Sequence, residues 1–324
     1  MQNPNEVYKL ALEAQLPYCV TETNFSSFGE SYRGKVRDNY ARGSSRIMVT
    51  TDRLSCFDRV VTAIPFKGVT LQALALYWFS RAAHIIPHHV ERVLDPQIML
   101  VTACEVLPIE VVVRGYLAGS AWRDYEAGRA VSGVKLARKM RRYQKLSEPI
   151  LTPSTKAAAG DHDLPISEQE IIAQKIIAPT LWTKVARTAQ ELFAQASDEV
   201  KKRGLILADT KYEFGLKSDE LMLVDEIHTL DSSRYWKMDS YAQRFESNQE
   251  PEMLDKEPTR QWLLAQGFKG DGMIPEFTAE HRCAIGEHYI NSAQLITGLQ
   301  IELPPAGDSL QRMQRVLTDA ALSN

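Results

Sequence analysis

The stretch GLILADTKYEFGLKSDELMLVDE, residues 204–226, predicts two strands joined by a turn, and it decides the fold of the region around it. Successive side chains of a strand point to opposite faces, so Asp209, Lys211 and Glu213 project together. The hairpin therefore presents a charged face, and the residues of that face are the first candidates for a functional site.

The second strand of this hairpin carries a further carboxylate. A turn through residues 218–220 places Glu213 directly opposite Asp225, and cross-strand partners lie only about 5 Å apart. Two carboxylates so placed repel each other unless a cation lies between them, and Mg²⁺ with water and phosphate oxygens suits such a pair. A register shifted by one residue instead turns Asp225 to the other face and gives a solvated hairpin. The periodicity leaves both interpretations open.

The composition of the chain limits the classes of protein to which it can belong. The chain has 324 residues, of which 44% are hydrophobic, and this is enough for a large core arranged as two lobes. The net charge of -3 gives no general attraction to nucleic acid or membrane. The most apolar window, residues 71–86, is too short to cross a bilayer, and no secretory signal is visible. Four cysteines without paired spacing disfavour a zinc site or disulfide framework and favour the cytoplasm.

The first hundred residues are predicted to be mixed, with more strand than helix. Residues 46–51 and 106–113 are rich in β-branched side chains and bounded by Gly, Ser or Pro, which is typical of strands. Between them, apolar residues recur at helical spacing over residues 71–82, with Thr70 as the expected N-cap.

The pattern becomes helical from Ser167 onward. Ser167 and Glu170 form a capping box, and Pro179 is expected to interrupt the helical run that leads to Gly204. Two further helices are expected near the C-terminus, over residues 278–297 and 309–322, after a polar stretch from 239 to 256.

A basic run lies between the predicted strands. Lysines and arginines occupy six of the eleven positions from Lys135 to Lys145, with no acidic residue among them. Such a run binds a nucleic-acid backbone in some proteins, but Tyr143 is its only aromatic residue. A solvated helix face is the stronger interpretation, and the nucleic-acid interpretation stays as an alternative.

Three other segments carry candidate ligand-binding groups. Gly34 lets the backbone approach a ligand, with Lys35 and Arg37 on one face of the following strand near phosphate oxygens, although a solvated turn is the stronger interpretation of these residues alone. Arg114 ends a strand and offers a planar fork for phosphate or carboxylate, but a structural ion pair is an alternative. The loop at residues 156–163 contains a histidine between two acids, which suits a metal ligand or a general base, although a histidine that caps a helix or forms a salt bridge is the stronger interpretation of these residues alone.

The order of these motifs resembles that of one enzyme family. The hairpin is followed by DSSRYW (231–236), and it is preceded by YRGKVRD (32–38), TDRLSCFD (51–58), PIEVVVRGYLAGS (108–120), TPSTKA (152–157) and GDHD (160–163). These blocks span most of the chain and are similar to those of the phosphoribosylaminoimidazole-succinocarboxamide synthase (SAICAR synthetase) family. The chain departs from the usual pattern at Ala158 and Ala159, where relatives commonly carry acids.

The resemblance implies an α+β, SAICAR synthetase-like two-lobe fold. A smaller antiparallel-sheet lobe, residues 1–107, would lie over a larger α/β lobe, residues 108–324, with ATP in the cleft between them. The implied reaction joins L-aspartate to a carboxyaminoimidazole ribotide at the expense of ATP, through an acyl phosphate. A small-molecule kinase with a similar ATP and Mg²⁺ cleft is the alternative, and only the synthase consumes aspartate. The expected partners are these small substrates, with no nucleic acid and no membrane.

The resemblance also implies roles for individual residues. The residues expected to take part in catalysis are Lys35, Lys211 and Asp209. The residues expected to bind Mg²⁺ are Glu213 and Asp225. The residues expected to bind ATP are Gly34, Lys35, Val36, Arg37, Glu105, Glu213 and Asp225. The residues expected to bind the ribotide and aspartate are Arg114, Ser120, Lys156, His162, Asp163, Asp231, Ser233 and Arg234.

Overall fold

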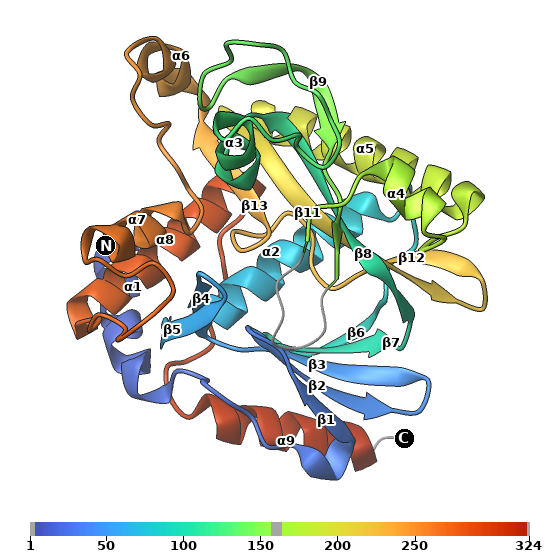
Figure 1. The fold of residues 1–324 in the computed structure, drawn as a ribbon. Helices are drawn as coiled ribbons and strands as arrows, with labels where there is room; N and C mark the ends of the chain where they lie inside the picture. Colours follow the sequence, from blue (N-terminus) through green and yellow to red (C-terminus); the bar gives the residue numbers. More distant parts are fainter. Residues whose placement is uncertain (1–3, 157–163, 323–324) are drawn as a thin grey trace. The chain divides into compact units, whose positions relative to one another are not determined.

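Antiparallel sheets organise the chain, as the computed structural model in Figure 1 shows; it describes residues 4–156 and 164–322. Contacts between residues divide the chain into two compact units. The first unit contains residues up to 77, residues 89–103 and residues from 255 onward, and the second contains residues 78–88 and 104–254.

The first unit contains a five-stranded sheet with the order β1-β2-β3-β7-β6. Its strands are β1 (Glu30–Arg33), β2 (Arg37–Arg42), β3 (Ser45–Thr50), β6 (Val90–Asp95) and β7 (Ile98–Thr102). A separate hairpin is formed by β4 (Arg53–Cys56) and β5 (Arg59–Ala63). The helices are α1 (Pro4–Gln15), η1 (Leu16–Tyr18), η2 (Ser26–Phe28), α7 (Glu257–Ala265), α8 (Ala279–Thr297), α9 (Ser309–Leu322) and the first part of α2 (Lys67–Ala82).

The C-terminal helix α9 completes the core of this first unit. Met313 and Leu317 are buried against Tyr40, Ile47 and Val49 of the sheet. The sequence predicted one boundary, at residues 107 and 108, with everything after it in the second lobe. The contacts divide the chain differently, because the residues from 255 onward belong to the same unit as the N-terminal sheet.

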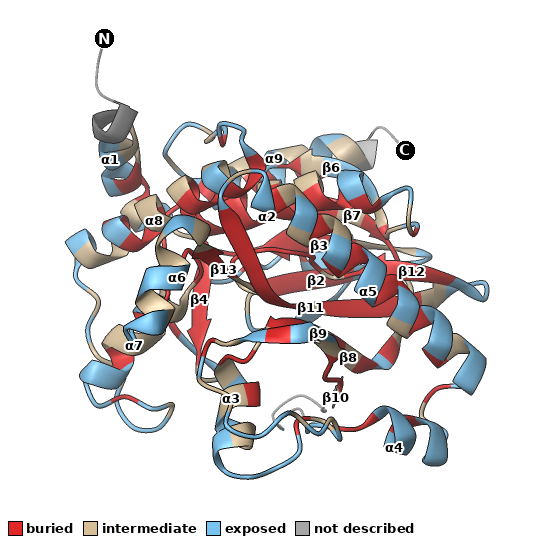
Figure 2. Ribbon diagram, turned by 90° about the horizontal axis from the view of Figure 1, so that it is seen from above, coloured by how far each residue is buried: buried red, intermediate tan, exposed pale blue. Residues whose placement is uncertain are grey.

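The second unit contains a six-stranded sheet in which β11 is central. Its strands are β8 (Glu105–Tyr116), β9 (Lys145–Leu151), β10 (Ser154–Thr155), β11 (Leu205–Lys217), β12 (Glu220–Val224) and β13 (Ser233–Lys237). Its helices are α3 (Gly119–Glu126), α4 (Glu168–Ala173), α5 (Pro179–Lys201) and α6 (Met238–Glu246). The long helix α5 packs along β11 and β8 (Figure 1), and Figure 2 shows that β11 is buried over most of its length.

The predicted helix boundaries are largely confirmed. Ser167 and Glu170 form a reciprocal capping box, and Pro179 begins α5 at its first position, where its missing N–H is not needed. The N-cap predicted at Thr70 is wrong: α2 already begins at Lys67, and the Thr70 hydroxyl donates to the carbonyl oxygen of Phe66. The first part of the polar stretch at 239–256 forms α6. Among the described residues, no helix is both long and apolar enough to span a bilayer.

Candidate active site

Strand β11 carries three charged side chains at alternate positions. Asp209, Lys211 and Glu213 therefore share one face of the sheet, as their spacing predicted. On the neighbouring strand β8, Arg114 lies opposite Asp209 and Glu110 lies opposite Glu213. The sheet in this way brings charged groups from two strands together in two adjacent clusters.

The first cluster, here called the lysine–carboxylate cluster, consists of Glu110, Lys156, Lys211, Glu213 and Asp225. The Lys211 ammonium donates to Glu213 and to Glu110, the latter at 2.9 Å, and lies 4.0 Å from Asp225. The Lys156 ammonium donates to the other carboxylate oxygen of Glu213. Two lysines thus face three carboxylates at one end of the β11 face, so the lysines offset only part of the negative charge.

The predicted pairing of Glu213 with Asp225 is wrong by one residue. Ser218 and Asp219 alone form the turn, so Glu213 lies opposite Val224 and β12 ends there. Asp225 has a φ of 65°, outside the strand conformation. Its carboxylate still reaches within 4.0 Å of the Lys211 ammonium. Because the backbone at Asp225 leaves the strand conformation, its carboxylate lies near Lys211 even though the register differs by one residue from the predicted one.

Burial and opposite charges set the protonation of this cluster. Burial favours neutral Lys211, but the carboxylates of Glu213, Glu110 and Asp225 outweigh it and hold the Lys211 pKa well above its ordinary value. Burial alone raises the pKa of Glu213, whereas Lys211 and Lys156 lower it well below its ordinary value. Glu213 is therefore an ionised carboxylate at neutral pH and an oxygen ligand suited to a hard cation.

The metal expectation rests on Glu213 and Asp225. Among the residues that the structure describes, no group of three or more His, Cys, Asp or Glu side chains is arranged around a common metal position. The two carboxylates nevertheless fit Mg²⁺, which usually keeps several waters and can take its other ligands from phosphate.

The second cluster, here called the arginine cluster, is centred on Asp209. Arg114 Nη1 donates to Asp209 Oδ2 at 3.0 Å, and Arg234 Nη1 donates to Asp209 Oδ2 at 2.8 Å. Arg114 also donates to Thr152 Oγ1 at 2.8 Å and to Ser120 Oγ at 3.0 Å. Arg114 and Asp209 are buried, while the Arg234 side chain keeps 19% of its surface exposed. Arg234 is therefore the more accessible cation of the pair.

Gly119 allows the Arg234 guanidinium to lie against the start of α3. It has a φ of 57°, and a Cβ at this position would lie 2.5 Å from Arg234 Nη2. Glycine is needed here both for the backbone conformation and for the close approach.

We expect Gly119→Ala to displace Arg234 and to raise the KM for an anionic substrate about tenfold, because a methyl group occupies the guanidinium position. Gly128→Ala is the matched control: its φ is 72°, but a Cβ there meets no atom within 4 Å. Both variants should lose about 1 kcal/mol of stability from the backbone strain. Equal KM values for the two variants in steady-state assays would contradict the role given to Gly119.

Hydrogen bonds from β11 and β13 hold the segment from Asp225 to Ser232. Tyr212 Oη and His228 Nε2 lie 2.6 Å apart, and Tyr235 Oη donates to the His228 carbonyl oxygen at 2.6 Å. The backbone N–H of Lys211 donates to the Ser232 carbonyl oxygen at 3.0 Å. These bonds fix the segment that delivers Asp225 to the first cluster and Arg234 to the second.

His228 makes the stability of this segment dependent on pH. Its burial lowers its pKa from 6.5 to about 3, so the folded protein holds it neutral. The unfolded chain binds a proton that the folded chain excludes, and this costs about 2 kcal/mol of stability at pH 5, growing as the pH falls toward 3. In urea unfolding at pH 7 and pH 5, His228→Gln should show a smaller loss between the two pH values than the parent. An equal loss would contradict this assignment.

In the first unit, the segment Gly34–Arg37 joins β1 to β2. The Gly34 N–H donates to the Arg37 carbonyl oxygen at 2.8 Å, and Arg53 donates to the carbonyl oxygens of Gly34 and Lys35 at 3.0 and 2.9 Å. Lys35 and Asp58 are both exposed, and their charged groups lie 2.5 Å apart. Arg53 thus fixes the turn and leaves the Lys35 side chain at the surface.

Some expected site residues are placed differently. Lys35 and Arg37 were expected on one face near phosphate, but Arg37 is buried within β2 whereas Lys35 is exposed. Val36 accepts hydrogen bonds from Thr51 through its carbonyl oxygen, and Glu105 is exposed at the start of β8. His162 and Asp163 lie outside the described residues.

The remaining expected residues lie near the arginine cluster. Ser233 is buried, with its hydroxyl 2.7 Å from that of Thr210. The Asp231 N–H donates to Thr229 Oγ1 at 3.2 Å. Ser120 touches Arg114 directly, as described above.

Two residues of the clusters were not singled out from the sequence. Glu110 and Thr152 contribute a carboxylate and a hydroxyl acceptor. Glu110 could have been found, because it lies four residues before Arg114 on the same strand and therefore on the same face. Thr152 gave no such signal, because its position depends on how β9 pairs with β8, and that pairing is irregular.

Comparison with known proteins gives consistent matches. The family model described as SAICAR synthetase matches residues 30–275. The phosphoribosylaminoimidazole-succinocarboxamide synthase of Legionella pneumophila (strain Paris) is 41% identical over 291 residues, which are 87% of this chain and 92% of that protein. The protein of the same name from Bacteroides thetaiotaomicron is 41% identical over 303 residues, 91% of this chain and 96% of its own length.

Solved structures agree with these relatives. The SAICAR-synthase from Saccharomyces cerevisiae, complexed with SAICAR, has a TM-score of 0.76 and 31% identity, and the match covers 87% of this chain and 99% of that one. A SAICAR synthetase (Type-2) in complex with ADP has a TM-score of 0.64 and 24% identity, over 85% of this chain and 100% of that one. The second similarity supports the fold alone.

Proposed function

Because the chain belongs to the SAICAR synthetase family, we infer that it is an ATP-dependent carbon–nitrogen ligase of purine biosynthesis. It joins L-aspartate to the carboxylate of 5-amino-1-(5-phosphoribosyl)imidazole-4-carboxylate and releases the succinocarboxamide, ADP and phosphate. The α+β fold predicted from the motifs agrees with the solved structures. The observation that carries the residue assignments is the alternation of Asp209, Lys211 and Glu213 along β11, which places two charge clusters side by side.

The chemistry needs an activated carboxylate, since a carboxylate is a poor electrophile at neutral pH. The γ-phosphoryl group of ATP is transferred to a carboxylate oxygen of the ribotide, and ADP leaves. The aspartate amine then attacks the carbonyl carbon, loses a proton and displaces phosphate, so that an amide bond forms. In such transfers the protein mainly positions the reactants and neutralises charge.

The lysine–carboxylate cluster is assigned to the phosphates of ATP. Glu213 and Asp225 would hold Mg²⁺, which supplies neutralisation of phosphate charge when bound. In the structure the Lys211 and Lys156 ammonium groups compensate these carboxylates. Once a cation takes over that role, the two ammonium groups are available to the transferring phosphoryl group and to aspartate.

The segment Gly34–Arg37 is assigned to the ATP phosphates as well. Its exposed cation, Lys35, pairs with an equally exposed carboxylate, Asp58. An exposed ion pair of this kind contributes little to stability, so the pair can exchange for a phosphate at small cost.

The arginine cluster is assigned to the ribotide. Arg114 already donates to three partners, so its main task is to fix Asp209 and Ser120. Arg234 is more exposed and keeps donors for an anionic group of the ribotide. Asp209, expected among the catalytic residues, is accordingly proposed as a positioning residue that orients both arginines.

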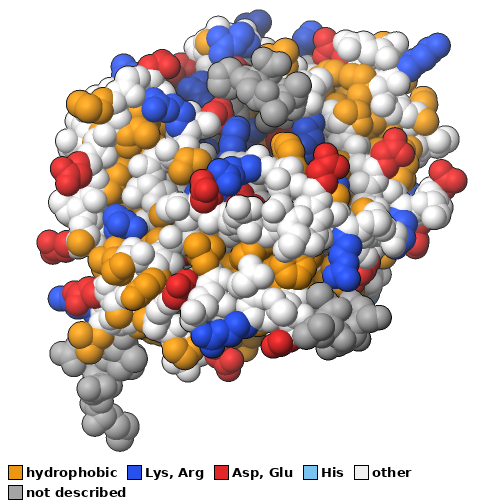
Figure 3. Space-filling view, turned by 90° about the horizontal axis from the view of Figure 1, so that it is seen from below, with side chains coloured by type: hydrophobic (Ala, Val, Ile, Leu, Met, Phe, Trp, Pro, Cys, Tyr) orange, Lys and Arg blue, Asp and Glu red, His pale blue; other side chains and the backbone are white. Residues whose placement is uncertain are grey.

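The charge distribution and the thiols support a small-molecule enzyme of the cytoplasm. Acidic and basic side chains are intermixed on the face shown in Figure 3, and the net charge is -3, so charge provides no general attraction to nucleic acid. The four cysteines are thiols rather than disulfides, which is the usual state in a reducing compartment.

The test is the steady-state release of ADP from ATP, Mg²⁺, the carboxyaminoimidazole ribotide and aspartate. We expect ADP and the succinocarboxamide in equal amounts, and no sustained release when aspartate is left out. Sustained ADP release without aspartate would instead support the small-molecule kinase, which the family matches do not favour.

A further inference from the structure

The basic run at residues 135–145 is not used by the proposed reaction. The sequence favoured a solvated helix face. The helix is wrong, because the run forms turns between α3 and β9, but most of its cations are exposed to solvent. Arg141 stacks on the Phe245 ring at 3.9 Å and pairs with Glu246, and Arg142 pairs with Glu250 at 3.3 Å. These two arginines therefore attach the run to α6 and the residues that follow it.

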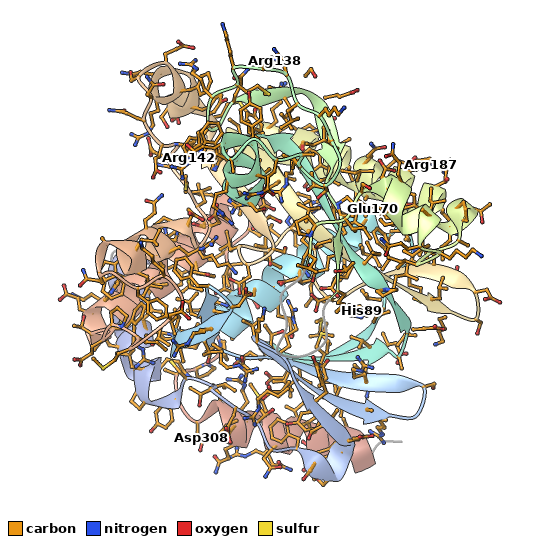
Figure 4. All side chains as sticks on the ribbon, viewed as in Figure 1. His89, Arg138, Arg142, Glu170, Arg187 and Asp308 are labelled. Atoms are coloured by element: carbon orange, nitrogen blue, oxygen red, sulfur yellow. The ribbon has the colours of Figure 1, made fainter. Side chains whose placement is uncertain are left out.

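The other cations of the run point to solvent. Lys135, Arg138, Lys139 and Lys145 are exposed, and none of the four has an ion-pair partner within the described parts of the chain. Arg138 lies at the outer edge of the segment, whereas Arg142 lies on the side toward α6 (Figure 4). In a chain with a net charge of -3, four unneutralised cations so close together form a distinct local field.

Two of these cations, Lys135 and Lys145, line an apolar groove. The groove encloses about 450 Å³ and runs between residues 134–140 and strand β9. Its apolar lining comes from Val134, Leu136, Ala137, Met140, Leu146 and Ile150, and its charged lining from Lys135, Lys145 and Glu148. An apolar floor with a charged border is the usual anatomy of a surface that binds another protein.

The groove has a fixed shape in the free protein. Leu136, Met140 and Ile150 pack against a buried cluster that includes Leu117 and Leu146. The Tyr125 hydroxyl donates to the Ala137 carbonyl oxygen at 2.9 Å and accepts from the Met140 N–H at 2.8 Å. A surface held in this way loses little conformational entropy when a ligand binds.

We propose that this groove binds a partner protein through a short acidic segment that carries apolar anchor residues. Charge complementarity selects the acidic segment, because Lys135 and Lys145 line the groove against one carboxylate, Glu148. Arg138 and Lys139 are exposed at neighbouring positions of the chain and add to the positive charge. The aliphatic lining selects the anchors and disfavours RNA, since no aromatic side chain lines the groove for base stacking. The site is independent of the ligase reaction and of the residues assigned to it.

The test uses fluorescence polarisation with the full-length protein and three labelled peptides of about a dozen residues. The first alternates Glu with Leu and Phe, the second replaces each Glu by Gln, and the third replaces each Leu and Phe by Ser. We expect the first peptide to bind at least tenfold more tightly than either of the others, with an affinity that weakens as salt rises.

The site is checked with Lys135→Glu combined with Lys139→Glu. This variant should bind the first peptide at least tenfold more weakly and retain ligase activity. Lys184→Glu with Lys201→Glu on α5 is the matched control, because it changes the net charge equally at exposed positions of the same unit and should leave peptide binding unchanged.

Three results would overturn the proposal. These are no preference for the first peptide, equal peptide binding by the two double variants, and tighter binding of a single-stranded RNA of similar length than of the first peptide. The last result would restore the nucleic-acid interpretation of the run.

Discussion

Glu213→Gln and Asp225→Asn should each lower kcat by about a thousandfold while the protein stays folded. Each change removes one of two carboxylates proposed to hold Mg²⁺, so the phosphates lose their main charge neutraliser. Asp219→Asn is the matched control, because Asp219 lies exposed in the turn of the same hairpin, away from the lysine–carboxylate cluster.

The measurement combines steady-state kinetics over a range of Mg²⁺ with calorimetric titration of ADP. Both active-site variants should lose the enhancement of ADP affinity by Mg²⁺, whereas the Asp219 variant should keep it. Glu213→Gln leaves the charges of Lys211 and Lys156 less well compensated, so thermal unfolding is measured to verify that the fold is intact. Near-normal turnover of either variant at millimolar Mg²⁺ would refute the metal assignment.

Arg234→Lys should raise the KM for the ribotide by about 30-fold and change the KM for ATP by less than twofold. An ammonium group cannot reproduce the planar fork that donates to Asp209 and keeps further donors for an anion. Arg187→Lys on α5 (Figure 4) serves as the control, since Arg187 is exposed and, among the residues that the structure describes, forms an ion pair only with Glu191 one turn away.

A larger rise in the ATP KM than in the ribotide KM would assign Arg234 to the nucleotide instead. Arg114→Lys should behave differently from Arg234→Lys, because Arg114 is buried and its three partners are all side chains of the protein. It should lower the free energy of unfolding by about 3 kcal/mol as well as the activity, since it leaves buried polar groups without donors.

The sequence was sufficient for the parts of the fold that depend on local pattern. The capping box at Ser167 and the alternation along β11 follow from side-chain periodicity and hydrogen-bonding chemistry within a few residues. The pairing of Asp209 with two arginines could be anticipated only in part. Family resemblance named the residues, but the contacts depend on two neighbouring strands that are distant in sequence.

Other features could not be read from a linear pattern. The position of Asp225 depends on a turn of two residues rather than three and on a positive φ that no side-chain periodicity reveals. The burial of Arg37 depends on the sheet to which β2 belongs. The grouping of residues 255–324 with the N-terminal sheet depends on contacts between residues far apart in sequence. Local propensity determines such long-range contacts least.

The discontinuous first unit has a consequence for the order in which the chain folds during synthesis. The second unit is complete in sequence once residue 254 has left the ribosome, so its sheet can form while later residues are still being made. The sheet β1-β2-β3-β7-β6 is synthesised early, but Met313 and Leu317, which complete its core, arrive last. Nascent chains that stop before α9 should therefore expose the apolar face of this sheet and be the most dependent on chaperones.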